Sequence, residues 1–277
     1  MQFTKMQGLG NDYVYLNCLE GEPEDLPGLA AALSRPHFGV GADGLICICP
    51  SRRADAAMRI FNADGSEGEM CGNGIRCVGK YLYDKGLTHK TTLTIDTLAG
   101  VKTLTLAVSE GRVVSVTVDM GEPRVPGPVT LRVDGRDVTV WPVDMGNPHA
   151  VIFVPDAQRV ELERLGPALE GHPYFPNRTN TEFVQVVDRK RLVLRVWERG
   201  SGATLACGTG ACAALAAGVR AGQVDREIRA ELPGGVLQLA WAGKDNHIYM
   251  TGPAETVFEG TWEGGCDRRS NDNDPDQ

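Results

Sequence analysis

The sequence predicts an α+β protein with two homologous, pseudo-symmetric domains, each a mainly antiparallel β-sheet wrapped around a central helix. Three observations support this fold class. A Cys-Gly-x-Gly motif occurs twice, at residues 71–74 and 207–210. The flanking segments of the two motifs align in one gapless register. Alternating apolar and polar residues are typical of half-buried strands, and each motif opens a segment with helical character.

The register points to an internal duplication. An offset of 136 residues pairs Cys71 with Cys207, and it also pairs Arg59 with Arg195. Far from the motifs, the same offset pairs Gly10-Asn11 with Gly146-Asn147, and both pairs lead into apolar runs. A register kept over such a distance indicates two copies of one structural unit.

The individual elements follow from local patterns. Residues 103–120 and 131–143 alternate around a Gly-containing turn, which predicts two antiparallel hairpins. The helices that follow the two motifs should end at Gly86 and Gly222, because glycine favours the helix C-terminus. The second helix is rich in alanine and should be buried on all sides.

These patterns give domain boundaries. We expect an N-terminal domain at 1–118, completed by a strand near 254–264, and a C-terminal domain at 119–253. The polar segment 266–277 is expected to be a disordered tail.

Composition limits the function classes. The 277 residues carry a net charge of −8 and a pI near 5.2, so no basic surface is expected to bind nucleic acid. No apolar run approaches the roughly 20 residues that span a bilayer. The first residues lack the charged and apolar regions of a secretory signal. We therefore expect a cytoplasmic protein that acts on a small molecule, with no membrane or nucleic-acid partner.

Most of the eight cysteines are expected to be free thiols, because this long acidic chain is expected in the cytoplasm, where disulfides are rare. None has the spacing of a zinc site, and no pyridoxal-lysine or nucleotide motif is present. We therefore expect no metal and no cofactor. Small buried side chains are the expected role of five cysteines: Cys18, Cys47, Cys49, Cys77 and Cys212.

Cys71 and Cys207 are predicted to form one catalytic site. Each stands at a helix start, where free backbone N–H groups and the helix dipole stabilise a thiolate. Two such helix ends, placed face to face, can hold one carboxylate between them. Two opposed sulfurs then flank the adjacent α-carbon, so that one thiolate removes its proton and the other thiol protonates the opposite face.

Polar residues near the motifs are expected to complete the site. Asparagines and an arginine suit a second carboxylate or a polar side chain. Glu198 could accept hydrogen bonds from a substrate ammonium, and His149 could tune a thiol. Without the repeat, each of these would be read as a turn residue, a surface charge or a structural histidine. The expected substrate-contacting side chains are those of Asn11, Asn62, Asn147, Asn180, Glu198 and Arg199.

The motifs MQGLGNDYV, RIFNADGSEGEMCGNGIRC, MGNPHAV, FPNRTNTEFVQV and ERGSGATLACGTGACAA resemble the diaminopimelate epimerase family. The resemblance implies cofactor-independent conversion of LL-2,6-diaminoheptanedioate to the meso form, in lysine and peptidoglycan-precursor synthesis. It implies that Cys71 and Cys207 are the base and the acid, and that His149 and Glu198 tune them. It also implies a homodimer. Backbone groups are implied to hold the reacting carboxylate at Gly72, Asn73, Gly208 and Thr209.

One departure keeps an alternative open. Ala203 stands where this family usually has a glutamate beside the cysteine loop. A racemase for another amino acid, such as histidine, therefore remains possible on the same scaffold. Two readings from other classes are a thiol redox protein with a Cys71–Cys207 disulfide and a non-catalytic amino-acid binding module.

Overall fold

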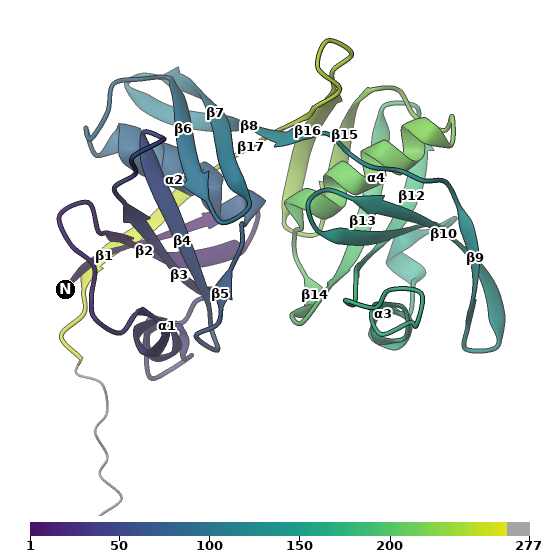
Figure 1. Cartoon of the computed structure of the whole chain (residues 1–277), viewed down its shortest axis with the longest axis horizontal. Helices are drawn as coiled ribbons and strands as arrows, with labels where there is room; N and C mark the ends of the chain where they lie inside the picture. The colour runs from purple at the N-terminus through teal and green to yellow at the C-terminus, as the bar shows by residue number, and fades with distance from the viewer. Residues whose placement is uncertain (265–277) are drawn as a thin grey trace, which may run out of the picture.

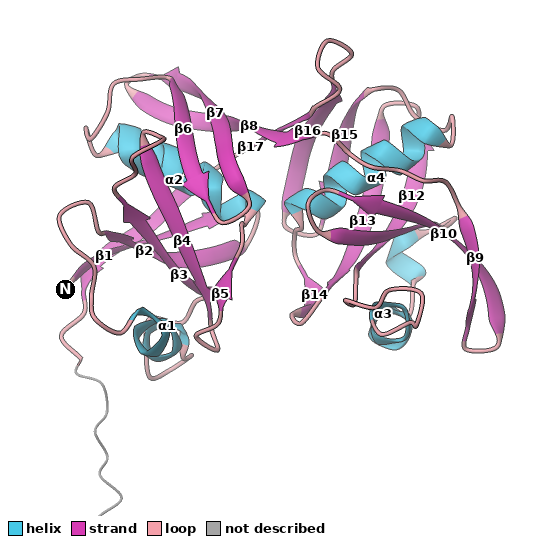
Figure 2. Cartoon of the chain, in the orientation of Figure 1, coloured by secondary structure: helices cyan, strands magenta, loops and turns pink. Residues whose placement is uncertain are grey.

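The computed structural model describes residues 1–264, which form two similar halves side by side (Figure 1). The tail expected at 266–277 lies outside the described residues. In each half, strands surround one long helix (Figure 2). The N-terminal half contains β1 Gln2–Gly8, β2 Asn11–Asn17, α1 Leu26–Ser34, β3 Gly44–Cys49, β4 Ala56–Asn62, β5 Glu67–Gly68, α2 Gly72–Asp84, β6 Thr92–Thr97, β7 Gly100–Ser109, β8 Arg112–Gly121 and, from the chain's end, β18 Glu255–Thr261. The C-terminal half contains β9 Val129–Val133, β10 Arg136–Asp144, β11 Pro148–Phe153, a short 3-10 helix Ala157–Arg159, α3 Leu162–Glu170, β12 Asn180–Asp188, β13 Arg191–Glu198, β14 Gly202–Thr204, α4 Gly208–Arg220, β15 Glu227–Leu232, β16 Gly235–Trp241 and β17 Ile248–Gly252.

Strand pairing repeats between the halves. In the first half, β1–β2 is antiparallel, β2–β3 parallel, β3–β4 antiparallel and β4–β6 parallel. In the second half, β10–β11, β11–β12, β12–β13 and β13–β15 follow the same sequence of directions. The predicted α+β class with two pseudo-symmetric, mainly antiparallel units is therefore confirmed.

Helices α2 and α4 are the central elements of the two halves, and their bounds differ by the same 136 residues as the motifs. Both are buried along nearly their whole length. Each ends just before a glycine with a positive φ, Gly86 at 70° and Gly222 at 70°, as the sequence predicted. A left-handed residue after the last turn is a common helix stop, and glycine adopts it without steric cost.

Two strands from the end of the chain connect the halves. β17 pairs with β16 on one side and with β8 on the other. β18 then returns to pair with β1. A continuous apolar core encloses α2 and α4 and includes Met250 of β17. Because the core crosses the junction, the relative placement of the halves is part of the folded structure.

The expected hairpins are also present. β7 and β8 join through Glu110 and Gly111, and β9 and β10 join through Asp134 and Gly135. All four residues have positive φ, the conformation of the tight turns that match strand twist. Within the part of the chain described, no helix is long and apolar enough to cross a membrane.

Candidate active site

A cleft of about 740 Å³ lies between the halves and is lined by both cysteines of the repeated motif. Its walls come from loops and strand ends of both halves, so neither half alone encloses it. All but one of the side chains and backbone positions predicted for the site line this cleft: Asn11, Asn62, Cys71, Gly72, Asn73, Asn147, Asn180, Glu198, Arg199, Cys207, Gly208 and Thr209.

The N-termini of α2 and α4 meet at this cleft, and Figure 1 shows the two helices end to end. A Cβ added to Gly72 would lie 3.6 Å from the Cα of Gly208. The two backbones are therefore in van der Waals range of each other, and a Cβ at either position would lie within 3.1 Å of the Met250 side chain. The free N–H groups of the two first turns are thereby brought to one place, where they can bind an anion.

Cys71 is the N-cap of α2. Its sulfur accepts a hydrogen bond from the N–H of Gly74 at 3.3 Å. The thiol also donates to Oδ1 of Asn11 at 3.2 Å. The amide nitrogen of Asn11 in turn donates to Oδ2 of Asp43 at 2.7 Å. These contacts fix the sulfur between a helix end and an asparagine whose orientation a carboxylate sets.

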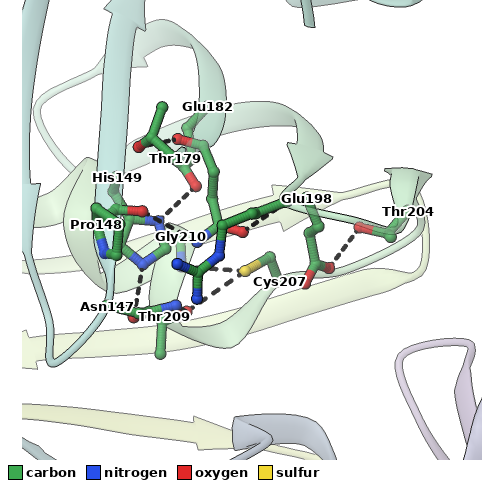
Figure 3. Close-up of polar contacts among 12 residues, drawn as sticks. Asn147, Pro148, His149, Thr179, Glu182, Glu198, Thr204, Cys207, Thr209 and Gly210 are labelled. Atoms are coloured by element: carbon green, nitrogen blue, oxygen red, sulfur yellow. Dashed lines mark hydrogen bonds and ion pairs between the residues drawn. The ribbon is translucent and has the colours of Figure 1, made fainter. Parts of the chain in front are cut away.

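Cys207 has the equivalent position in α4, where its sulfur accepts from the N–H of Gly210 at 3.3 Å. Its surroundings differ from those of Cys71. The Thr209 hydroxyl lies 3.5 Å from the sulfur (Figure 3). Cys207 itself is only 5% exposed. The duplicated helix ends therefore present the two sulfurs alike, while the side chains beside them are not symmetric.

Burial raises the pKa of both thiols above the ordinary cysteine value. The Glu198 carboxylate raises the pKa of both further, and helix N–H groups oppose these effects at each sulfur. Burial also raises the pKa of Glu198 itself, against a hydrogen bond from the Thr204 hydroxyl. Glu198 thus acts electrostatically on both cysteines from one position, and a substrate cation beside it would offset its effect.

Two of the predicted polar residues are held by local hydrogen bonds. The amide of Asn62 donates to Ser66 at 3.0 Å. Asn180 donates to the carbonyl of Pro148 and accepts from the backbone N–H of Arg199, both at 3.0 Å. Their side chains are therefore preorganised, while the Arg199 side chain is exposed at the cleft.

Asn73 connects the two cysteine loops. Its side-chain amide donates to the carbonyl of Ala206 at 2.9 Å, across the boundary between the halves. The residue is 2% exposed, and its side-chain oxygen has no hydrogen-bond partner within the described residues. Its side chain therefore ties one loop to the other, in addition to the backbone role that the sequence predicted for it.

His149 is the predicted site residue that does not line the cleft. It is 1% exposed, and one ring nitrogen lies 3.0 Å from Oδ1 of Asn147. The other lies 2.7 Å from Glu182 (Figure 3). Its hydrogen bonds therefore connect it to the cleft through Asn147, which does line it.

Asp43 and Glu182 were not predicted as part of the site. The repeat pairs them with Thr179 and Ile46, so the offset gives no signal for either. The available clue for Glu182 was an acidic residue inside the apolar run TEFVQVV. Ala203, where the resemblance implied a glutamate, lines the cleft from β14. Among residues 1–264, no cluster of His, Cys, Asp and Glu is arranged to hold a metal ion.

A two-half fold with a cysteine at each of two abutting helix ends defines an isomerase of the racemase and epimerase class. Comparison with known proteins is more specific, since the family model "Diaminopimelate epimerase" matches residues 3–126 and 142–257. The diaminopimelate epimerase of Acetivibrio thermocellus is 52% identical over 94% of this chain and 98% of its own length. The diaminopimelate epimerase of Methanococcus maripaludis is 50% identical over 94% of this chain and 99% of its own length. The chain belongs to the diaminopimelate epimerase family, which confirms the resemblance seen in the motifs.

Solved structures of more distant proteins share the fold. A probable proline racemase from Agrobacterium radiobacter superposes with a TM-score of 0.77 at 19% identity, covering 97% of this chain and 94% of its own. A hydroxyproline epimerase from Agrobacterium vitis gives 0.75 at 19% identity, covering 94% and 91%. At this level of identity the similarity establishes the two-half architecture.

Proposed function

We propose that this chain converts LL-2,6-diaminoheptanedioate to the meso isomer through acid and base catalysis by Cys71 and Cys207. One observation carries the proposal: the two sulfurs cap two helices whose N-termini abut in one cleft. The family membership supports the substrate, because the relatives above are named for it.

The reaction requires two proton transfers on opposite faces of one α-carbon. The thiolate on one side takes the α-proton, and the bonding pair stays on the carbon as the carboxylate becomes enolate-like. First-turn N–H groups of α2 and α4 stabilise the developing negative charge. The thiol on the other side then donates its proton to the carbon, so the two sulfurs exchange protonation states in one turnover.

The polar lining of the cleft supports a substrate with a second carboxylate. Asn62 comes from the N-terminal half, and Asn180 and Arg199 come from the C-terminal half. An exposed guanidinium beside amide donors suits a carboxylate better than an imidazole. This composition favours the diaminopimelate reaction over racemisation of histidine, which remains the second candidate because of Ala203.

Incubation with LL-diaminopimelate in D2O under reducing conditions tests the proposal. We expect meso product that carries one deuterium at the inverted α-carbon. Absence of exchange would overturn it, and exchange with L-histidine but not with diaminopimelate would favour the second candidate. Cys71→Ala and Cys207→Ala should each reduce turnover by about 10³-fold or more, since each removes one of two required groups.

We also propose that the enzyme works in the cytoplasm as a homodimer, in lysine and peptidoglycan-precursor synthesis. Among the described strands, β18 pairs only with β1, so its outer edge is open. Val257 and Phe258 on this strand are 54% and 45% exposed. An exposed edge with apolar side chains is a common place for a second copy to pair. Sedimentation equilibrium of the wild type and Phe258→Asp tests this, with dissociation expected for the variant.

A further inference from the structure

Glu182 occupies an unusual place beside the first turn of α4. It lies in β12, its side chain is 0% exposed, and its Oε1 would be 2.5 Å from a Cβ on Gly210. Residue 210 therefore has to be glycine for the carboxylate to fit there. A carboxylate at a helix N-terminus is favoured by the helix dipole. Its other oxygen, Oε2, has no hydrogen-bond partner within the described residues.

Glu182 binds His149, and the pair fixes the proton positions on the imidazole. Oε1 lies 2.7 Å from Nδ1, and Nε2 lies 3.0 Å from Oδ1 of Asn147. An amide oxygen only accepts, so Nε2 must carry hydrogen. The remaining proton lies between Nδ1 and the carboxylate, whichever of the two holds it. The pair is thus net neutral, and it presents a donor to Asn147 in either state.

The orientation of Asn147 determines what reaches Cys207. With its oxygen on His149, its amide nitrogen faces the Thr209 hydroxyl at 3.4 Å. When that hydroxyl oxygen accepts from Asn147, its own hydrogen can point to the sulfur of Cys207, 3.5 Å away. This contact lowers the pKa of Cys207, whereas burial and the charges of Glu198 and Glu182 raise it. Figure 3 shows this series of contacts running from Glu182 to the sulfur.

We propose that Glu182 is a positioning residue for proton transfer at Cys207, acting through His149, Asn147 and Thr209. The inference rests on the proposed role of Cys207 as an acid and base. It assigns to the buried histidine a task it can perform without contact with the substrate. At Cys71 the series is shorter and has no histidine, because Asp43 orients Asn11 and Asn11 accepts directly from the thiol.

Three variants separate orientation from charge. Glu182→Leu removes the partner of His149, so the ring and the Asn147 amide are free to turn over. We expect kcat to fall about 10- to 100-fold with KM within about threefold, the scale of a misplaced catalytic group. Glu182→Gln can donate from its amide to Nδ1 while Nε2–H still holds Asn147, and it should stay within about threefold of the wild type. Thr209→Val should reproduce the effect of Glu182→Leu.

The second readout is the alkylation rate of each active-site cysteine, followed by peptide mass spectrometry. Glu182→Leu should slow iodoacetamide alkylation of Cys207 about fivefold at pH 8 relative to Glu182→Gln, since both variants lose the carboxylate charge and only the leucine variant also loses the donor to the thiolate. The rate at Cys71 should not change. The double variant with Thr209→Val should be no slower than either single variant, because the two act in one series.

Asp84→Asn is the matched control for loss of a buried carboxylate. Asp84 binds Lys80 at 2.7 Å near the end of α2 that is remote from the cleft, and its side chain is 9% exposed. This variant should lower the melting temperature and leave kcat within about twofold of the wild type.

Wild-type turnover in Glu182→Leu or in Thr209→Val would overturn the inference, and so would equal Cys207 alkylation rates in Glu182→Leu and Glu182→Gln. An equal loss of kcat in a folded Glu182→Gln would also overturn it, because the glutamine keeps the hydrogen bond to His149 and should therefore keep activity. If Glu182→Leu does not fold, the Gln and Val variants still decide the question. Normal turnover in Cys207→Ala would instead refute the proposed function itself.

Discussion

Gly72 and Gly208 face each other where the two halves meet, and each lies close to the side chain of Met250. The glycines are the first residues of α2 and α4. Their contact brings two sets of unpaired N–H groups together, which neither half can achieve alone. The separation of these two backbones is therefore a functional distance, and a methyl group at either glycine would press on the methionine that packs beside both.

Gly208→Ala should impair activity more than stability. The added Cβ would lie 3.0 Å from Sδ of Met250 and 3.5 Å from the Cα of Gly72. The methionine side chain can move, so we expect a loss of about 1–2 kcal/mol in unfolding free energy. Because this methionine packs against both helix ends, its displacement should disturb their placement and reduce kcat about 10-fold or more. Gly243→Ala is the control, since nothing lies within 4 Å of its Cβ. Equal kinetics for both variants would contradict the prediction.

Asp43→Ala should release the asparagine that faces Cys71. Oδ2 of Asp43 accepts from the Asn11 amide at 2.7 Å and from the Asp12 N–H at 3.0 Å. Without it the amide can rotate, and the Cys71 thiol loses its acceptor. We expect kcat to fall about 10-fold. Asp43→Asn keeps one oxygen for both donors and should stay within about threefold. Steady-state kinetics of the pair decide this, and similar values for the two variants would argue against it.

Arg76→Met should shift the pH dependence of the reaction. Arg76 is 0% exposed, donates to the carbonyls of Gly72 and Pro253, and forms no ion pair within the described chain. Its charge lowers the pKa of Cys71, so its loss should move the rising limb of kcat/KM to higher pH.

The stability change in Arg76→Met should be modest. Loss of hydrogen bonds to two carbonyls is offset by removal of a buried unpaired charge, a cost of several kcal/mol. Arg229 is an exposed arginine of β15. Arg229→Met is therefore the control for the loss of one positive charge far from burial. An unchanged pH profile in a folded Arg76→Met would refute the electrostatic role.

Cys212→Ala should make the free energy of unfolding fall less steeply as the pH rises into the alkaline range. Burial raises the pKa of Cys212 from 9.0 to about 12. Between these values the unfolded chain has released the proton that the folded chain keeps, so stability falls as the pH rises. One such group contributes about 1.4 kcal/mol per pH unit. Urea unfolding of both proteins from pH 7 to pH 11 measures the slopes, and identical slopes would contradict the assignment.

The repeat, the two helices and most of the cleft were predictable from the sequence. The register of 136 residues predicted two equivalent helices after the cysteine motifs and their stops at Gly86 and Gly222, because a duplicated helix keeps its cap, its stop and its buried face. Asn11 and Asn147 were predicted for the same reason, since both follow the glycine of a repeated turn. Neither the periodicity nor the offset identified Asp43 or Glu182, whose equivalents in the other half are Thr179 and Ile46.

The sequence by itself determined which local units exist: two capped helices, their hairpins and a cysteine at each helix end. These depend on neighbouring residues, through capping, turn conformation and apolar periodicity. Only the tertiary structure decided that Gly72 meets Gly208 and that His149 lies between Glu182 and Asn147. Those contacts depend on how β17 and the shared core join the halves, and on which carboxylate fills the space that a glycine leaves. Such contacts involve residues far apart in the chain, and no local pattern records them.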